Sequence, residues 1–74
     1  MGEVDMPVKV GDVFYAIGAY SYDIWQVACN GYLSDGKGGL LLVGVYGITW
    51  KLGFDAFLTR EEAEEAIERR MENA

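Results

Sequence analysis

A capped segment near the C-terminal end, residues 57–70 (F-L-T-R-E-E-A-E-E-A-I-E-R-R), most constrains how this chain can fold. Thr59 and Glu62 have the spacing of a capping box, in which the threonine hydroxyl accepts from the Glu62 amide and the glutamate carboxylate accepts from the Thr59 amide. No glycine or proline interrupts the residues that follow, as far as Met71. The sequence therefore predicts a C-terminal helix over residues 59–72.

Two opposite faces of this helix differ in polarity when the residues are placed at 100° intervals. The side chains expected to be buried are Ala63, Ala66, Ile67 and Met71. The acidic stripe on the opposite side consists of Glu61, Glu65, Glu68 and Glu72. Arg70 lies within the apolar stripe, so we expect it either to extend its charged end to the rim or to mark the point where the helix frays. Because the apolar stripe is narrow, the helix needs a sheet to hold it.

Short strands separated by glycine turns are predicted upstream of the helix, at residues 13–17, 24–33, 40–46 and 48–54, with a brief further pairing at 56–58. The second strand divides by period-2 alternation into two faces. One face carries Trp25, Val27, Cys29 and Leu33, and the other carries Gln26, Ala28, Asn30 and Tyr32. The segment S-D-G-K-G-G at residues 34–39 predicts an antiparallel hairpin between the second and third strands.

The third strand, residues 40–46, is apolar on both faces. This pattern predicts a central strand that is covered on each side, with the C-terminal helix as one cover. The predicted fold class is therefore α+β: a small, strongly bent antiparallel sheet or SH3-like barrel of 4–5 strands, followed by one C-terminal helix. Residues 1–7 are expected to form a short arm because Pro7 favours an extended residue before it. Residues 8–74 are expected to form a single domain.

Catalytic and metal-binding residue types are scarce in this chain. It has no histidine and one cysteine, so a zinc site or a Cys/His catalytic site has almost no ligands from which to be built. Cys29 is expected to be a buried core thiol. The glycine-rich loop lacks the spacing of a phosphate-binding P-loop and is not followed by a helix. We therefore expect no enzyme activity, no cofactor and no metal.

The net charge of −6 is spread over the whole chain. Residues 59–74 carry six acidic and three basic side chains, and residues 1–58 carry the same numbers. A generally acidic surface repels phosphate backbones, which argues against direct nucleic-acid binding and favours a basic partner. No signal-peptide pattern opens the chain, and the longest apolar run is shorter than the ~20 residues of a membrane span. We expect a cytoplasmic protein with no membrane partner.

The two ends of the chain resemble a group of small proteins of unassigned function from phages and prophages. These proteins often open with a K-x-G-D-x-V-Y-like strand and close with V-F-L-T-R-E-E-A-E-x-A-L. The counterparts here are Lys9, Gly11, Asp12 and Tyr15, then residues 57–64 and Ala66. The match covers about a third of the chain, and residues 36–47 depart from it. The resemblance implies a compact β-fold plus helix from a mobile element and implies no enzymatic activity.

The expected function is a non-enzymatic protein-binding module of mobile-element origin, acting as an acidic inhibitor of a host nuclease-type defence protein with a basic surface. The residues expected to contact the partner are Glu61, Glu65, Glu68, Tyr20, Tyr22, Tyr32 and Tyr46. One alternative is a small-molecule module, in which aromatics around Tyr20, Tyr22, Trp25 and Trp50 line a pocket or dimer groove for a nucleotide-like ligand. A structural or assembly protein, including a homodimer, is the other alternative.

Overall fold

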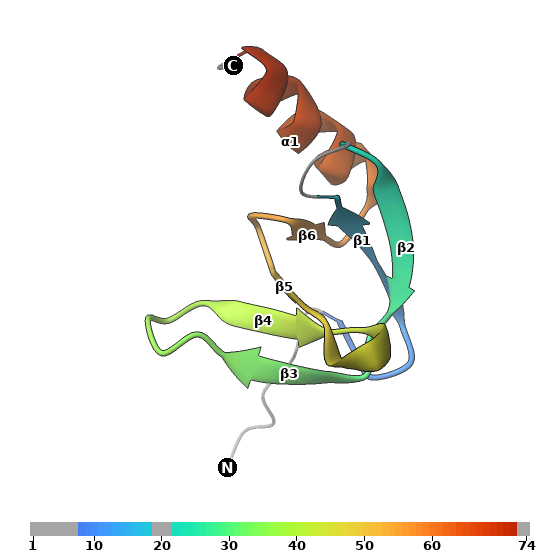
Figure 1. The fold of residues 1–74 in the computed structure, drawn as a ribbon, viewed down its shortest axis with the longest axis vertical. Coiled ribbons are helices and arrows are strands. Elements are labelled where there is room, and N and C mark those ends of the chain that lie inside the picture. Colours follow the sequence, from blue (N-terminus) through green and yellow to red (C-terminus); the bar gives the residue numbers. More distant parts are fainter. Residues whose placement is uncertain (1–7, 19–21, 73–74) are drawn as a thin grey trace.

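A computed structural model of the protein describes residues 8–18 and 22–72, and the predicted arm at residues 1–7 lies outside them. Within the described ranges, six short strands and a 3₁₀ turn precede one helix (Figure 1). The elements are β1 (Val13–Ile17), β2 (Ile24–Ala28), β3 (Gly31–Ser34), β4 (Leu40–Val43), η1 (Val45–Gly47), β5 (Thr49–Lys51), β6 (Ala56–Phe57) and α1 (Arg60–Glu72). This order confirms the predicted α+β class with a C-terminal helix.

The strands form two three-stranded sheets, ordered β2-β1-β6 and β3-β4-β5. Every strand pair within them is antiparallel. The sheets lie against each other but do not close into a barrel. The predicted hairpin is confirmed, with Ser34 opposite Leu40 at its base.

The predicted strand over residues 24–33 divides in two because the chain changes sheets in its middle. The Cys29 amide donates to the Asp12 carbonyl at 2.8 Å, beside β1, whereas the next amide, of Asn30, donates to the Val43 carbonyl at 2.7 Å, beside β4. This change of partner breaks the period-2 alternation. Tyr32 therefore packs against the core and Leu33 is exposed, the reverse of the predicted faces.

The main core lies between the two sheets. Its buried side chains are Val8, Phe14, Ala16, Val27, Cys29, Leu42 and Ala56. Phe14 meets Trp50 of the other sheet edge to face, with ring centroids 5.7 Å apart. Such aromatic pairs add about 0.5–1.5 kcal/mol beyond the area that they bury. The predicted burial of the Cys29 thiol is confirmed, since its residue is fully buried.

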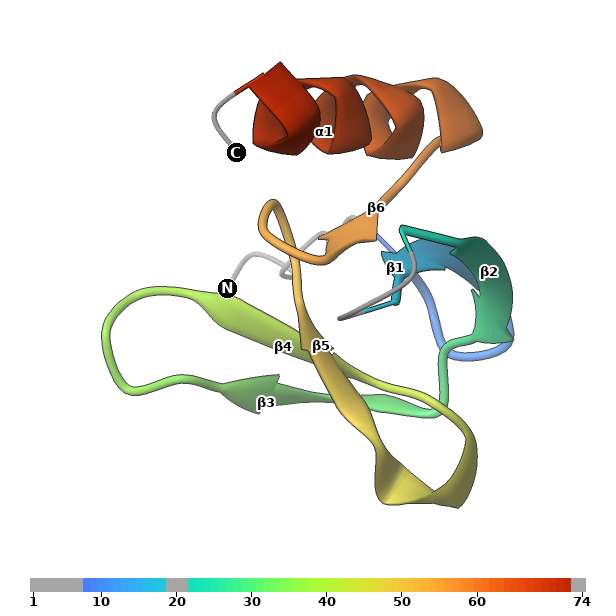
Figure 2. The ribbon, with the colours of Figure 1, turned by 45° about the horizontal axis from the view of Figure 1, so that its top comes forward.

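The helix covers the opposite face of the β2-β1-β6 sheet (Figure 2). Ile17, Phe57 and Ala63 are buried there, and Ala66 and Ile67 pack beside them. The strand covered on both faces is therefore β1. The prediction that the helix covers residues 40–46 is wrong, because only two residues separate β6 from α1 and β6 pairs with β1.

Both ends of the helix are held by side chains. The Glu62 amide donates to the Thr59 hydroxyl oxygen at 3.2 Å, as the capping box predicts. The Glu62 carboxylate, however, accepts from the Thr59 hydroxyl at 3.3 Å. At the C-terminal end Met71 is 62% exposed, contrary to the predicted buried stripe. Arg70, and not Met71, contacts the rest of the fold at this end of the helix. Its guanidinium lies 5.0 Å from the centroid of the Phe54 ring and donates to the Phe54 carbonyl.

Candidate functional site

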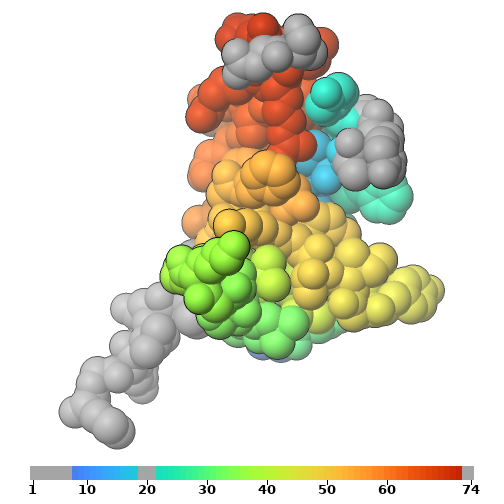
Figure 3. All heavy atoms as spheres, turned by 60° about the vertical axis from the view of Figure 1, so that its left-hand side comes forward, coloured from blue at the N-terminus to red at the C-terminus, as the bar shows by residue number. Residues whose placement is uncertain are grey.

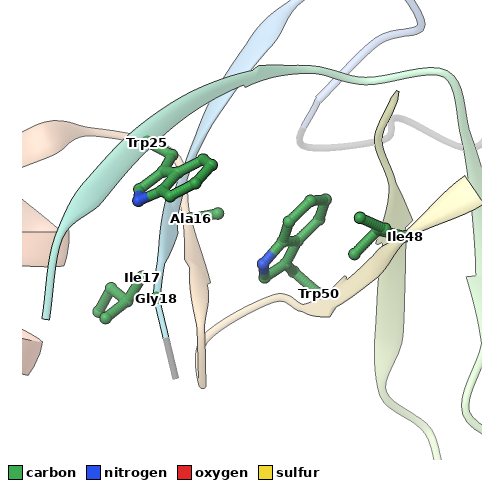
Figure 4. Close-up of a pocket in the computed structure, with 6 residues that line it drawn as sticks. All are labelled: Ala16, Ile17, Gly18, Trp25, Ile48 and Trp50. Carbon is green, nitrogen blue, oxygen red and sulfur yellow. The ribbon is translucent and has the colours of Figure 1, made fainter. Parts of the chain in front are cut away.

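The structure has an apolar pocket of about 210 Å³ where the edge strands β2 and β5 of the two sheets approach each other (Figure 4). Its lining carries almost no polar surface. Its lining, as far as the described residues go, consists of Ala16, Ile17, Gly18, Trp25, Ile48 and Trp50. Figure 4 shows the two indole side chains entering this space from different sheets, with Ala16 between them. The pocket thus exists because the two sheets remain open at this edge.

Trp25 forms the outer wall of the pocket. It lies directly opposite Ala16 in the β1–β2 ladder, and residues paired in this way project from the same face of a sheet. Because the alanine methyl group is small, the space in front of the indole is not filled by the neighbouring strand. Trp25 is 59% exposed, so most of this wall is open to solvent.

Trp50 forms the inner wall and is held more firmly. It pairs with Leu42 of β4, which is fully buried, and its ring packs against Phe14. Gly44 provides the room for this indole, because a Cβ atom at that position would lie 2.5 Å from Cζ3 of Trp50 and 2.5 Å from Cγ1 of Val27. The position of this wall is therefore set by the core.

The rim of the pocket beside Trp50 is also apolar. Ile48 lines the pocket, and its amide donates to the carbonyl of Val45 in η1 at 3.2 Å. Both residues are exposed, and Tyr46 between them is 94% exposed. Figure 3 shows the η1 segment, in yellow, projecting from the molecular surface. The pocket and this projection place several exposed apolar side chains in one region of the fold.

The three glutamates predicted to contact a partner lie elsewhere. Glu61, Glu65 and Glu68 are exposed on α1, and none of them lines the pocket. The Glu65 carboxylate (Oε2) lies 3.8 Å from Nη2 of Arg69, so part of its charge is balanced within the helix. The acidic face is therefore a surface separate from the aromatic pocket.

The predicted tyrosines do not form a common pocket lining. Tyr20 lies outside the described residues, and Tyr22 is exposed just before β2 with a positive φ of 55°. Tyr32 packs against the main core, and its burial raises the pKa of its hydroxyl. Tyr46 is exposed on η1.

The pocket was only partly predictable from the sequence. Trp25 and Trp50 are two of the four aromatics named for the alternative pocket, and both line it. Ala16, Ile17, Gly18 and Ile48 were missed. The only signal for them was Ala16, a small residue in a strand of large apolar residues.

The hairpin loop at residues 34–39 holds its own amides and offers no phosphate cradle. The Asp35 carboxylate accepts from the amides of Lys37 at 2.7 Å and Gly39 at 2.8 Å. Its other oxygen lies 3.3 Å from Nζ of Lys51. These contacts, the Lys37 amide first among them, lower the pKa of Asp35. The loop is a structural turn, as its glycine content indicated.

We expect the variant Asp35→Asn to lose stability at neutral pH but not in strong acid. Because the folded state lowers the pKa of Asp35, this carboxylate stabilises the fold above the ordinary aspartate pKa of about 3.9, and its contribution is lost as the pH falls through the lowered folded value. Partial burial raises the pKa of Asp55, so this carboxylate changes the stability with pH in the opposite direction. Because Asp55 is present in both the wild-type protein and the variant, its effect cancels in the comparison. Urea unfolding at about pH 7 and pH 2 measures the difference. A difference between the two proteins that is the same at both pH values would contradict the prediction.

No family model, curated protein or solved structure matches this chain. Among residues 8–18 and 22–72, no three cysteine or carboxylate side chains are grouped so that they could hold a metal ion. The helix of the described chain is neither long nor apolar enough to cross a membrane. The case for a site therefore depends on the geometry of the pocket itself.

Proposed function

We propose that this protein is a non-enzymatic protein-binding module whose aromatic pocket receives a side chain of its partner. One observation carries the proposal: both tryptophans of the chain line a single open apolar pocket, and Trp25 is 59% exposed there. Tryptophan is enriched among the few residues that dominate binding energy at protein interfaces. A large indole left this exposed is better explained by contact with a partner than by folding alone.

The partner that this surface favours is basic. The protein has a net charge of −6. In the described part of the chain, neither Glu61 nor Glu68 forms an ion pair with a basic side chain. Such a charge distribution increases the association rate with a positively charged surface and does so most strongly at low salt. Together with the phage-like ends, this supports a role as an inhibitor of a host nuclease-type defence protein.

A small molecule is a second candidate occupant because the pocket is concave and lined by two indoles. Its volume of about 210 Å³ is below the ~300–1,000 Å³ typical of ligand pockets. A nucleotide would also require polar and cationic groups for its phosphates, and among residues 8–18 and 22–72 no such side chain lines the pocket. The pocket therefore suits a single side chain better than a nucleotide.

Capture of partners from a host lysate at low salt, with tagged wild-type protein and a Trp25→Ala variant, tests the proposal. We expect Trp25→Ala to weaken binding of the captured partner at least ~30-fold, the effect of losing an interface residue worth about 2 kcal/mol. Phe54→Ala is the matched control, since Phe54 is 64% exposed but does not line the pocket. A wild-type protein that captures nothing, or a Trp25→Ala variant that binds the partner equally well, would count against the proposed function.

A further inference from the structure

We propose that the side chain entering the pocket is an arginine of the basic partner, with its guanidinium group against the two indoles. This inference rests on the proposed function and specifies its contact. Tryptophan is the aromatic side chain that attracts cations most strongly, and arginine is the cation found most often against it. The pocket offers two indoles from different sheets, with the small Ala16 between them (Figure 4).

The charges around the pocket favour a cationic occupant. In the part of the chain that the structure describes, no basic residue lines the pocket. The Gly18 amide donates to the Asp23 carbonyl at 2.9 Å, which extends the β1–β2 ladder one pair beyond Ile17 and Ile24. Because alternate residues of a strand share a face, Asp23 lies on the same face as Trp25. Asp23 is exposed, and its ladder partner Gly18 lines the pocket. The backbone therefore places an acidic residue on the face of the sheet that carries Trp25, opposite a residue that lines the pocket.

Arginine fits these conditions better than lysine or leucine. Its guanidinium is planar, stacks on aromatic rings and is more weakly hydrated than the lysine ammonium, so it loses less on entering an apolar space. Leucine would fill the same space, but it would gain nothing from Asp23 or from the net charge of −6. The combination of two indoles and one nearby carboxylate is what selects for the guanidinium.

Intrinsic fluorescence provides a direct assay, because the only two tryptophans of the chain both line the pocket. The protein is titrated with four blocked peptides that differ at one central residue: arginine, its neutral analogue citrulline, lysine or leucine. We expect saturable binding of the arginine peptide, at least 10-fold tighter than that of the citrulline and leucine peptides and tighter than that of the lysine peptide. We also expect its affinity to fall as salt is added.

The variant Asp23→Asn separates the role of the carboxylate from the apolar contact. We expect it to weaken binding of the arginine peptide about 5-fold, the upper end of what an ion pair between exposed side chains contributes, and to leave the citrulline peptide unchanged. Glu68→Gln is the control, since it removes one exposed charge from α1 away from the pocket lining. An equal loss in both variants would overturn the role of Asp23.

Different experiments test the arginine assignment and the proposed function, so each can fail without the other. A leucine or citrulline peptide that binds as tightly as the arginine peptide, or an arginine peptide that leaves the fluorescence unchanged, overturns the arginine assignment. Neither result changes the meaning of the capture experiment. If the Trp25→Ala variant binds the captured partner more weakly than the wild-type protein does, the pocket still binds a protein partner. Conversely, partner capture that is insensitive to Trp25→Ala overturns the proposed function whichever peptide binds.

Discussion

Replacing Phe14 with alanine should lower the free energy of unfolding by about 3–5 kcal/mol, the usual cost of removing a buried aromatic ring. Phe14 is fully buried between the two sheets, and its ring packs against Trp50. A domain this small has a stability near the lower end of the usual 5–15 kcal/mol, so this loss removes a large share of the total. The melting temperature should therefore fall by more than ~10 °C. Circular dichroism during heating and urea titration measures both quantities.

Phe54→Ala is the matched control for this substitution. Phe54 is 64% exposed, and the guanidinium of Arg70 lies over its ring. Its loss should cost at most about 1 kcal/mol, the value of a cation–π contact at an exposed site. If Phe14→Ala were no more destabilising than Phe54→Ala, the packing between the two sheets would not be as described.

Replacing Gly44 with alanine should destabilise the protein by about 1–3 kcal/mol through overpacking. A Cβ atom at this position would lie 2.5 Å from both Trp50 and Val27, closer than such atoms can approach. The backbone of Gly44, with φ −108°, is in a region that any residue can adopt, so the penalty comes from the lack of space. The indole of Trp50 must move to accept the methyl group. We therefore expect a shift in the tryptophan fluorescence spectrum as well as a lower melting temperature.

Gly31→Ala is the control for this prediction because the two changes are chemically identical. An added Cβ at Gly31 would meet no atom within 4 Å, and its φ is not in the left-handed region. We expect this variant to be unchanged or more stable by up to about 1 kcal/mol, since alanine restricts the unfolded chain. A Gly44→Ala variant that is as stable as Gly31→Ala would show that Trp50 does not pack against the backbone at Gly44.

Local signals in the sequence were sufficient for the elements that are stabilised by near neighbours. The capping residues Thr59 and Glu62 marked the helix start correctly because their hydrogen bonds join residues three apart. The hairpin at residues 34–39 was correct for the same reason, since the Asp35 carboxylate holds amides within the same loop. These contacts join residues that are close in the sequence, so a local pattern was enough to predict them.

Long-range contacts account for the predictions that were wrong. The alternation of residues 24–33 gave no sign that Cys29 and Asn30 bond to different sheets, because their partners Asp12 and Val43 lie far away in the sequence. Met71 was expected to be buried from its angle on the helix. In the structure the turn at Phe54 lies beneath Arg70 instead, and Met71 is exposed.

The same distinction applies to the candidate site. The sequence by itself determined that the chain is acidic, that it has no histidine and only one cysteine, and that a capped helix follows a set of short strands. It also named Trp25 and Trp50, together with Tyr20 and Tyr22, as aromatics that could line a pocket or dimer groove. Only the tertiary structure decided that both tryptophans line one pocket. That outcome depends on two sheets that remain open at one edge, with Ala16 and Gly44 leaving space for the indoles, and no local pattern encodes the distance between strands that are not neighbours in the chain.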